Sequence, residues 1–340
     1  MYSFCLKMYD PGKGKWLLTG LNLAACAVHL LSGAAGTALA RASNPTVPCI
    51  VPFVDLRTAP HGNSTETFVP APSTVFRVGS LTGLLLFAWI TAAFHLVYIV
   101  QIHSPRFQEA QRRLLGGGGV NPVRWVEYTI TAGIMAAFAN LLIGISDFYI
   151  FLKVLCANAA MQMIGFALEL LDVRDPLQKR LAGILWNQAT VLNLVNIAIL
   201  LTQLFGSKTH SNVFYYNILP YALLFNTFGA VAWLNFKRAG PFASGVYTEC
   251  WYIGLSLGTK LAVFWLGFAT WRGLEESRGF APKTRGVSWD AVRYAASYGP
   301  LGLMLAAAAY EYARARQGHR ATHVAKPHHK THRKSTTVEL

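Results

Sequence analysis

Long apolar blocks separated by polar segments dominate the chain. Helix is the form expected for them, because lipid offers no hydrogen-bond partner to a free backbone N–H or C=O. Each block has the ~18 or more residues that a helix needs to cross the ~30 Å hydrocarbon layer of a bilayer. The pattern predicts an all-α membrane protein, a rhodopsin-like bundle of seven helices, with blocks at about 16–40, 78–101, 123–145, 148–171, 181–205, 213–236 and 244–271.

The connections between the blocks differ greatly in length. The first, residues 41–77, is long and Pro-rich and contains a β-prone run at 46–54, which predicts a small β-structured extracellular loop. The connection between the third and fourth blocks is little more than Ser146-Asp147. Such a short link predicts that these two helices are antiparallel neighbours.

The pattern changes after residue 272. Residues 273–290 are polar, and an apolar stretch at 294–310 is interrupted by Gly299-Pro300. Two interpretations stay open for this stretch: an eighth membrane span, or a helix lying at the membrane interface. The domain organisation expected is a cytoplasmic N-terminus at 1–15, the bundle at 16–272, a linker with the eighth helix at 273–312, and a basic disordered tail at 313–340.

Composition supports a membrane protein. Hydrophobic residues make up 53% of the chain and charged residues only 13%, too few charges to cover a soluble domain of this size. A net charge of +15 is also typical of proteins that bind nucleic acid, but much of the excess lies in loops and in the tail. Cytoplasmic loops beside anionic lipid explain it better, so the lipid bilayer is the partner expected and nucleic acid is not.

The basic residues also predict an orientation. The N-terminus and every second connection hold twelve of them, whereas the opposite loops hold four. The positive-inside rule therefore places the N-terminus in the cytoplasm. A glycosylation triplet at Asn63-Ser64-Thr65 lies on the predicted outer side and agrees weakly. The cytoplasmic set is Lys7, Lys13, Lys15, Arg106, Arg112, Arg113, Arg124, Arg174, Lys179, Arg180, Lys237 and Arg238.

Lys260 is the outstanding charge inside the membrane. A charge at the bilayer centre costs at least ~2.5–3.5 kcal/mol on insertion scales, and Lys260 lies in the middle of the seventh block. A buried lysine loses its proton easily and then attacks carbonyls, which is Schiff-base chemistry. The alternative is a structural lysine paired with a carboxylate. Glu127, in the third block, is the natural partner, unless it faces lipid headgroups.

Other polar residues fall in the same region of the bundle. His29 and His95 lie at overlapping depth, either as core histidines or as the lining of a proton-accepting cavity, since imidazole titrates near neutrality. Glu249 lies about three turns inward of Lys260, near the interface, where it either relays protons or faces water. Glu169 falls near the inner end of the fourth block.

Four local patterns resemble one family of retinal proteins, the heliorhodopsins. They are the segments around His29 and His95, Arg124-Trp-Val-Glu-Tyr-Thr-Ile-Thr-Ala132, and Ser256-x-x-x-Lys260 ending in Trp265. The inward N-terminus agrees with the inverted topology of that family. The long first loop also resembles that family, in which this loop forms strands at a dimer interface. The resemblance covers residues 16–272 and leaves 273–340 outside.

The resemblance implies a role for each matching position. Lys260 would form the protonated Schiff base of all-trans retinal, with Glu127 as its counterion. His29 and His95 would line an inner cavity that receives the proton. A homodimer and a signalling partner of unknown identity are also implied. The pocket residues implied are Trp125, Tyr128, Thr131, Asn158, Ser256 and Trp265.

Departures from pumping rhodopsins shape the functional prediction. An outward pump carries an aspartate four residues before the lysine, where this chain has Ser256, and a second carboxylate where it has Phe138. A separate departure concerns the heliorhodopsin pattern: Ser32 replaces an amide that this resemblance implies one turn after His29. A photoreceptor that signals by conformational change without active pumping, and that is not an enzyme, is favoured. The alternatives are a light-gated passive proton or ion channel and a retinal-free multi-span receptor or transporter.

Overall fold

The computed structural model describes nine stretches of the chain and a few isolated positions elsewhere. The stretches are 11–40, 46–51, 54–58, 66–70, 73–79, 81–107, 120–142, 145–206 and 219–277. The chain divides into two compact units, residues 1–301 and 302–340. The expected helix at 294–310 and the basic tail at 313–340 lie outside the described residues, apart from single positions.

Seven long helices form in the described part of the chain, one for each predicted block, so the predicted helical bundle is confirmed. Two short 3₁₀ helices, η1 (Pro105–Phe107) and η3 (Gly240–Ala243), lie in the connections. The long helices are α2 (Pro11–Ala40), α3 (Thr82–His103), α5 (Pro122–Leu142), α6 (Phe148–Leu170), α7 (Pro176–Gly206), α9 (Leu219–Phe236) and α10 (Gly245–Ser277).

The start of α7 differs from the prediction. The helix begins at Pro176, one and a half turns before the apolar block at 181. Asp175 explains the earlier start, because its carboxylate accepts a hydrogen bond from the backbone N–H of Leu177 at 2.8 Å. An Asp cap followed by proline at the first helical position is a strong helix start. The polar first turn of α7 therefore precedes its apolar block.

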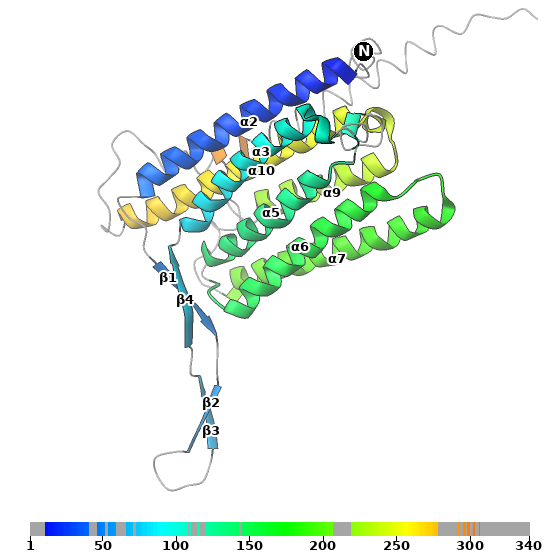
Figure 1. Cartoon of the computed structure of the whole chain (residues 1–340). Coiled ribbons are helices and arrows are strands. Elements are labelled where there is room, and N and C mark those ends of the chain that lie inside the picture. The colour runs from blue at the N-terminus through cyan, green and yellow to red at the C-terminus, as the bar shows by residue number, and fades with distance from the viewer. Residues whose placement is uncertain are drawn as a thin grey trace, which may run out of the picture. The chain divides into compact units, whose positions relative to one another are not determined.

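Helix α10 contacts α2, α3, α5 and α9, and α6 and α7 lie on the far side of α5 from α2 (Figure 1). The short connection between α5 and α6 makes them packed antiparallel neighbours, as predicted. Helix α6 also contacts α7 and α9. Among the membrane-span candidates, α10 is the most enclosed by protein, whereas α6 and α7 are the least enclosed. The latter two therefore offer the most surface to lipid.

The first loop forms two antiparallel strand pairs. Strand β1 (Thr46–Val51) pairs with β4 (Ser73–Gly79), and β2 (Val54–Thr58) pairs with β3 (Glu66–Pro70). The prediction of β structure here is confirmed. The Ile50 N–H also donates to the Ser146 carbonyl at 2.8 Å, which attaches β1 to the link between α5 and α6.

Five of the described helices are long and apolar enough to cross a membrane: α2, α3, α6, α7 and α10. The described apolar part of α9, Leu223–Phe236, is shorter. Helix α5 does not meet this measure, and it carries Arg124 and Glu127. Polar groups on such a helix need shielding by the rest of the bundle.

A polar layer separates two apolar clusters in the bundle. One cluster includes Leu84, Phe87, Met135, Phe264 and Phe268, toward the end where α3 begins. The other joins α2, α3 and α10 near the opposite end and consists of Leu18, Ala25, Ile102, Leu114, Val246 and Ile253. On α2, α3 and α10, the residues between the clusters include His29, His95 and Lys260. These polar side chains are therefore held in the interior, away from both ends of the bundle.

Candidate functional site

The centre of the site is an ion pair between Lys260 of α10 and Glu127 of α5. Both residues are buried, with 4% and 1% of their surface exposed. Each charge compensates the other, which a buried charge requires because its loss of hydration is otherwise uncompensated. The predicted pairing of this lysine with this glutamate is therefore present in the structure.

Tyr98 of α3 holds the second oxygen of the Glu127 carboxylate. Its hydroxyl donates to Oε2 at 2.5 Å, and Tyr98 is itself buried. The sequence interpretation missed Tyr98. A signal was present, because Tyr98 follows His95 by three residues and so shares its side of the helix. Glu127 thus has one oxygen on Lys260 and the other on a phenol.

Aromatic rings surround the Lys260 amine. Nζ lies 5.3 Å from the ring centre of Tyr128, close enough for a cation–π attraction. The Tyr128 hydroxyl donates to the backbone carbonyl of Tyr252 at 3.1 Å. Phe228 of α9 packs edge-on against Tyr128, with ring centres 5.5 Å apart. Tyr128 is thereby fixed from both α9 and α10.

The two histidines lie side by side next to this ion pair. The rings of His29 and His95 stack with centroids 5.8 Å apart and planes 13° apart, and both residues are 1% exposed. His95 Nδ1 lies 2.8 Å from Oδ1 of Asn22 on α2. Sequence reasoning looked for an amide one turn after His29 and found Ser32. In the structure the amide is that of Asn22, which lies two turns before His29 on the same side of α2.

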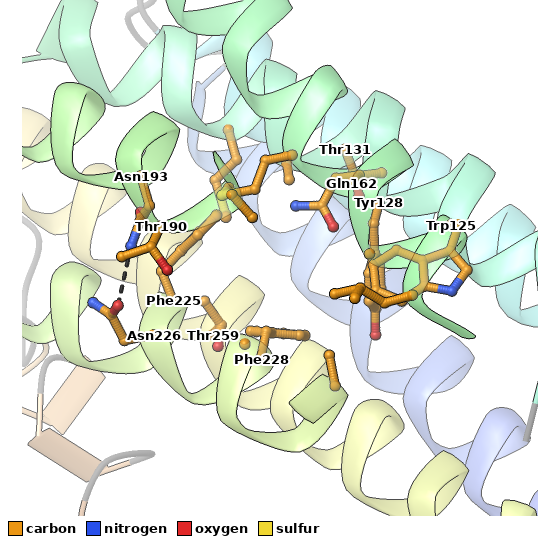
Figure 2. A pocket seen from close by; sticks show the side chains of 18 of the residues that line it. Trp125, Tyr128, Thr131, Gln162, Thr190, Asn193, Phe225, Asn226, Phe228 and Thr259 are labelled. Carbon is orange, nitrogen blue, oxygen red and sulfur yellow. Dashed lines mark hydrogen bonds between the residues drawn. The ribbon is translucent and has the colours of Figure 1, made fainter. Parts of the chain in front are cut away.

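A cavity of about 890 Å³, a figure that includes the space at its mouth, lies beside Lys260. Helices α5, α6, α7, α9 and α10 all contribute to its lining. Figure 2 shows Trp125 and Tyr128 on one side and the Asn193–Asn226 pair, joined at 3.0 Å, on the other. The many apolar and aromatic groups that line the cavity suit an apolar ligand.

The predicted pocket residues divide into two groups. Trp125, Tyr128 and Thr131 line the cavity together with Lys260, whereas Asn158, Ser256 and Trp265 do not. Asn158 and Ser256 are buried, and Trp265 packs against the apolar cluster that contains Phe264 and Phe268. Sequence reasoning also missed part of the lining, which α6, α7 and α9 supply: Met161, Gln162, Gly165, Trp186, Asn193, Phe225 and Phe228.

Arg124, Glu169 and Glu249 form a second buried charge cluster. The Arg124 guanidinium pairs with Glu249 through one nitrogen and with Glu169 through the other. The sequence interpretation counted Arg124 with the cytoplasmic basic residues and placed Glu249 near the interface. The structure shows that neither side chain faces water, because Arg124 is 1% exposed and Glu249 is 4% exposed. Both residues lie near an end of their own helix, where neighbouring helices cover them. The pattern along a single helix does not reveal this cover.

This charge cluster is continuous with the cavity. Trp125, a cavity residue, donates its indole N–H to Glu169 at 2.7 Å. Asn121 donates to Glu249 at 2.8 Å, and the Arg124 guanidinium carbon lies 3.9 Å from the centre of the Tyr252 ring. The cluster therefore joins α5, α6 and α10 at one end of the cavity and sets the position of Trp125.

Replacing Arg124 with leucine is expected to destabilise the bundle strongly. The change leaves Glu169 and Glu249 buried without their cation, and breaking a buried ion pair costs about 3–5 kcal/mol. The expected result is a clearly lower thermal midpoint in detergent or lipid. Leucine at the exposed Arg174 should leave that midpoint unchanged. Equal midpoints for the two variants would contradict a stabilising role for the cluster.

A comparison with protein-family models identifies a family for this chain. A family model described as Heliorhodopsin matches residues 18–271, which is most of the chain and nearly the range over which the sequence resemblance was expected. No curated protein matches the chain.

Proposed function

Because this chain belongs to the heliorhodopsin family, we propose that it is a light sensor that carries all-trans retinal on Lys260 and signals by a change of conformation without pumping ions. The family makes it an integral membrane protein and a light-sensing rhodopsin with a retinal chromophore. The observation that carries the proposal is the buried ion pair that Glu127 forms with Lys260, a residue that lines an apolar cavity.

The residues present fit a retinal aldehyde. Lys260 supplies a primary amine at the cavity lining, and Glu127 supplies one negative charge to balance a protonated Schiff base. The rings of Trp125, Trp186, Phe225 and Phe228 give the apolar lining that a polyene needs. When bound, retinal supplies a light-driven isomerisation next to the Lys260 nitrogen.

The chain's own residues would then stabilise the positive charge at the Lys260 nitrogen and accept its proton. Glu127 holds the positive charge at Lys260 in the dark, and Tyr98 restrains the carboxylate. A movement of the Lys260 nitrogen away from Glu127 breaks the ion pair and releases the proton. His29 and His95 lie beside the pair and would take it. The ion pair is one of the interactions that hold α5 against α10. Its loss would therefore let a local change of charge alter the packing of these two helices.

The absence of pumping is supported by the apolar cluster on one side of the ion pair. Its members, among them Phe87, Met135 and Phe264, carry no titratable group. Phe138 stands where a pump would have a carboxylate, and it packs with its ring centre 6.0 Å from that of Phe151. The histidines lie beside the ion pair as proton acceptors, whereas Phe138 offers none at its position, which supports a sensor over a pump.

The orientation proposed puts the N-terminus in the cytoplasm, on the basis of the basic residues in the connections. The Arg124 cluster and the start of α10 then lie on the cytoplasmic side of Lys260. A signal from the ion pair would reach that side through Trp125 and Tyr128, which contact both the cavity and these inner groups.

The first test is the colour of the protein. Expressed with all-trans retinal, the chain is expected to show a visible absorption band that hydroxylamine bleaches. Chain made without retinal is the control. A retinal-supplied protein that stays colourless would refute retinal binding at Lys260 and favour the retinal-free receptor or transporter.

The second test separates a sensor from a light-gated channel. Cells that express the pigment are held under voltage clamp and illuminated, with pH gradients in both directions. A sensor is expected to give no steady photocurrent. Reproducible currents that reverse with the proton gradient would replace the sensor with a passive channel, and variants of His95 and Glu249 would then locate the path.

Substitution of Tyr98 by phenylalanine is expected to shift the absorption band to shorter wavelength. Without the phenol, the Glu127 charge is no longer shared between two donors and acts more strongly on the Lys260 nitrogen. A stronger counterion lowers the energy of the ground state relative to the excited state, in which positive charge moves along the polyene. Phenylalanine at the exposed Tyr149 is the matched control. A shift to longer wavelength would contradict this account of Tyr98.

A further inference from the structure

Asn22 of α2 and His95 of α3 form a buried hydrogen bond beside the ion pair. The Asn22 Oδ1 atom and His95 Nδ1 are 2.8 Å apart, and the two residues are 2% and 1% exposed. The apolar residues Leu18, Ala25 and Ile102 pack in the same part of the α2–α3 contact. Two polar side chains in such surroundings have few alternative partners, so their bond is well defined.

The direction of this hydrogen bond follows from the other end of the Asn22 amide. Its Nδ2 donates to the backbone carbonyl oxygen of Leu18 at 2.8 Å. Turning the amide over would set its oxygen against that carbonyl, and two acceptors repel each other. The Asn22 oxygen therefore faces His95. Since an amide oxygen only accepts hydrogen bonds, His95 Nδ1 must carry the N–H.

A neutral imidazole carries one N–H, so Nε2 of His95 then has a free lone pair. This nitrogen is buried and has no hydrogen-bond partner among the described residues. The titratable groups around the ring come from four helices: His29 stacks on it, the Tyr98 ring lies 5.7 Å away, and Glu127 and Lys260 are close enough to interact electrostatically. Lys260 and Tyr98 occupy the Glu127 oxygens. The Nε2 lone pair is thus available as a proton acceptor.

We propose that Asn22 is a positioning residue that holds His95 in the Nδ1–H tautomer, so that Nε2 is the atom that takes the proton from the Lys260 nitrogen after illumination. This inference rests on the function proposed above. The N–H bond at Lys260 breaks and leaves its electron pair on that nitrogen, which becomes neutral. The proton adds to the Nε2 lone pair, and His95 becomes an imidazolium.

Asn22 also stabilises the product of this transfer. The Nδ1–H of an imidazolium donates a charge-assisted hydrogen bond to the Asn22 oxygen, which is stronger than the bond made by neutral His95. Glu127 stays anionic and compensates the new cation. The same group that selects the acceptor atom therefore favours the charged state of the acceptor.

The dark state tests the tautomer directly. Full-length protein with ¹⁵N-labelled histidine is reconstituted in lipid and examined by NMR, and the His95 signals are assigned by their loss in His95→Phe. The expected result is a protonated Nδ1 and an unprotonated Nε2. A protonated Nε2 in neutral His95 would overturn the proposal. This measurement needs no substitution at Asn22.

Substitution tests the role of the amide. Asn22→Leu is expected to abolish the bias between the two tautomers and to slow the light-driven deprotonation at Lys260 about tenfold, the usual scale for loss of a residue that orients another. Asn22→Asp keeps an oxygen acceptor for His95 Nδ1–H and should keep the tautomer, with a loss of stability because its other oxygen faces the Leu18 carbonyl. The control is Asn140→Leu, because Asn140 is buried and donates to the carbonyl four residues before it in the same way.

The outcomes separate this proposal from the one it rests on. Unchanged His95 signals and an unchanged deprotonation rate in Asn22→Leu would overturn the positioning role while leaving the pigment intact. A colourless wild-type protein would instead refute the retinal function, and the histidine tautomer would still be measured on that protein. An Asn140→Leu variant that matches Asn22→Leu in both readouts would also count against the proposal.

Discussion

Lys260→Ala is expected to abolish the visible absorption of protein expressed with all-trans retinal. The side chain supplies the amine of the proposed linkage and lies in the cavity lining beside Glu127. Alanine has no nucleophile, so no covalent pigment can form there. The measurement is the visible spectrum of the purified variant against the wild type, normalised to protein concentration.

Two controls make this result specific. The first is alanine at Lys153, an exposed lysine of another membrane helix, which should leave the colour unchanged. The second is the helical content of Lys260→Ala by circular dichroism, because this variant also leaves Glu127 buried without its cation. A folded Lys260→Ala protein that keeps a hydroxylamine-sensitive visible band would place the linkage on another lysine.

Glu127→Gln is expected to have the second largest effect, a strong shift of the absorption band to longer wavelength. Glutamine removes the negative charge next to Lys260 but can still accept the hydrogen bond from Tyr98. The ground state, in which positive charge lies at the nitrogen, loses more stabilisation than the excited state. Where the nitrogen of Lys260 instead loses its proton, the visible band itself is lost.

The same variant should be less stable than the wild type. Removing one partner of a buried ion pair costs about 3–5 kcal/mol, because the remaining charge is left uncompensated. Denaturation of the pigment at a series of temperatures would measure the loss. Asparagine at the exposed Asp172 is the matched acid-to-amide control, for which neither colour nor stability should change. An unchanged spectrum in Glu127→Gln would remove Glu127 from the counterion role.

The sequence was most informative where a single helix determines the outcome. The spacing of the apolar blocks predicted all seven helices of the described bundle, and the β-prone run predicted strand β1. Lys260 and Glu127 could be paired in advance because a charge in the middle of an apolar block requires a partner, and few acids were available at the right depth. Both arguments rest on composition along one segment.

The sequence was less informative where several helices contribute. Arg124 and Glu249 looked like surface charges, since each lies near the end of its own helix, but α5, α6 and α10 cover them together. Asn22 carries no unusual signal along the chain, and Tyr98 carries only its spacing of three residues from His95. The importance of both arises from the side chains opposite them. Much of the cavity lining comes from α6, α7 and α9, from which the sequence interpretation took only Asn158 as a pocket residue.

The sequence by itself determined a membrane bundle with an amine in its interior, because the bilayer limits each segment to a helix of a certain length and penalises every charge within it. Only the tertiary structure decided which polar atoms meet: one phenol on Glu127, one amide on His95, and two carboxylates on Arg124. The physical reason is that hydrogen bonds and buried ion pairs act over about 3 Å, and the rotation and packing of several helices, which no single segment encodes, bring such atoms into range.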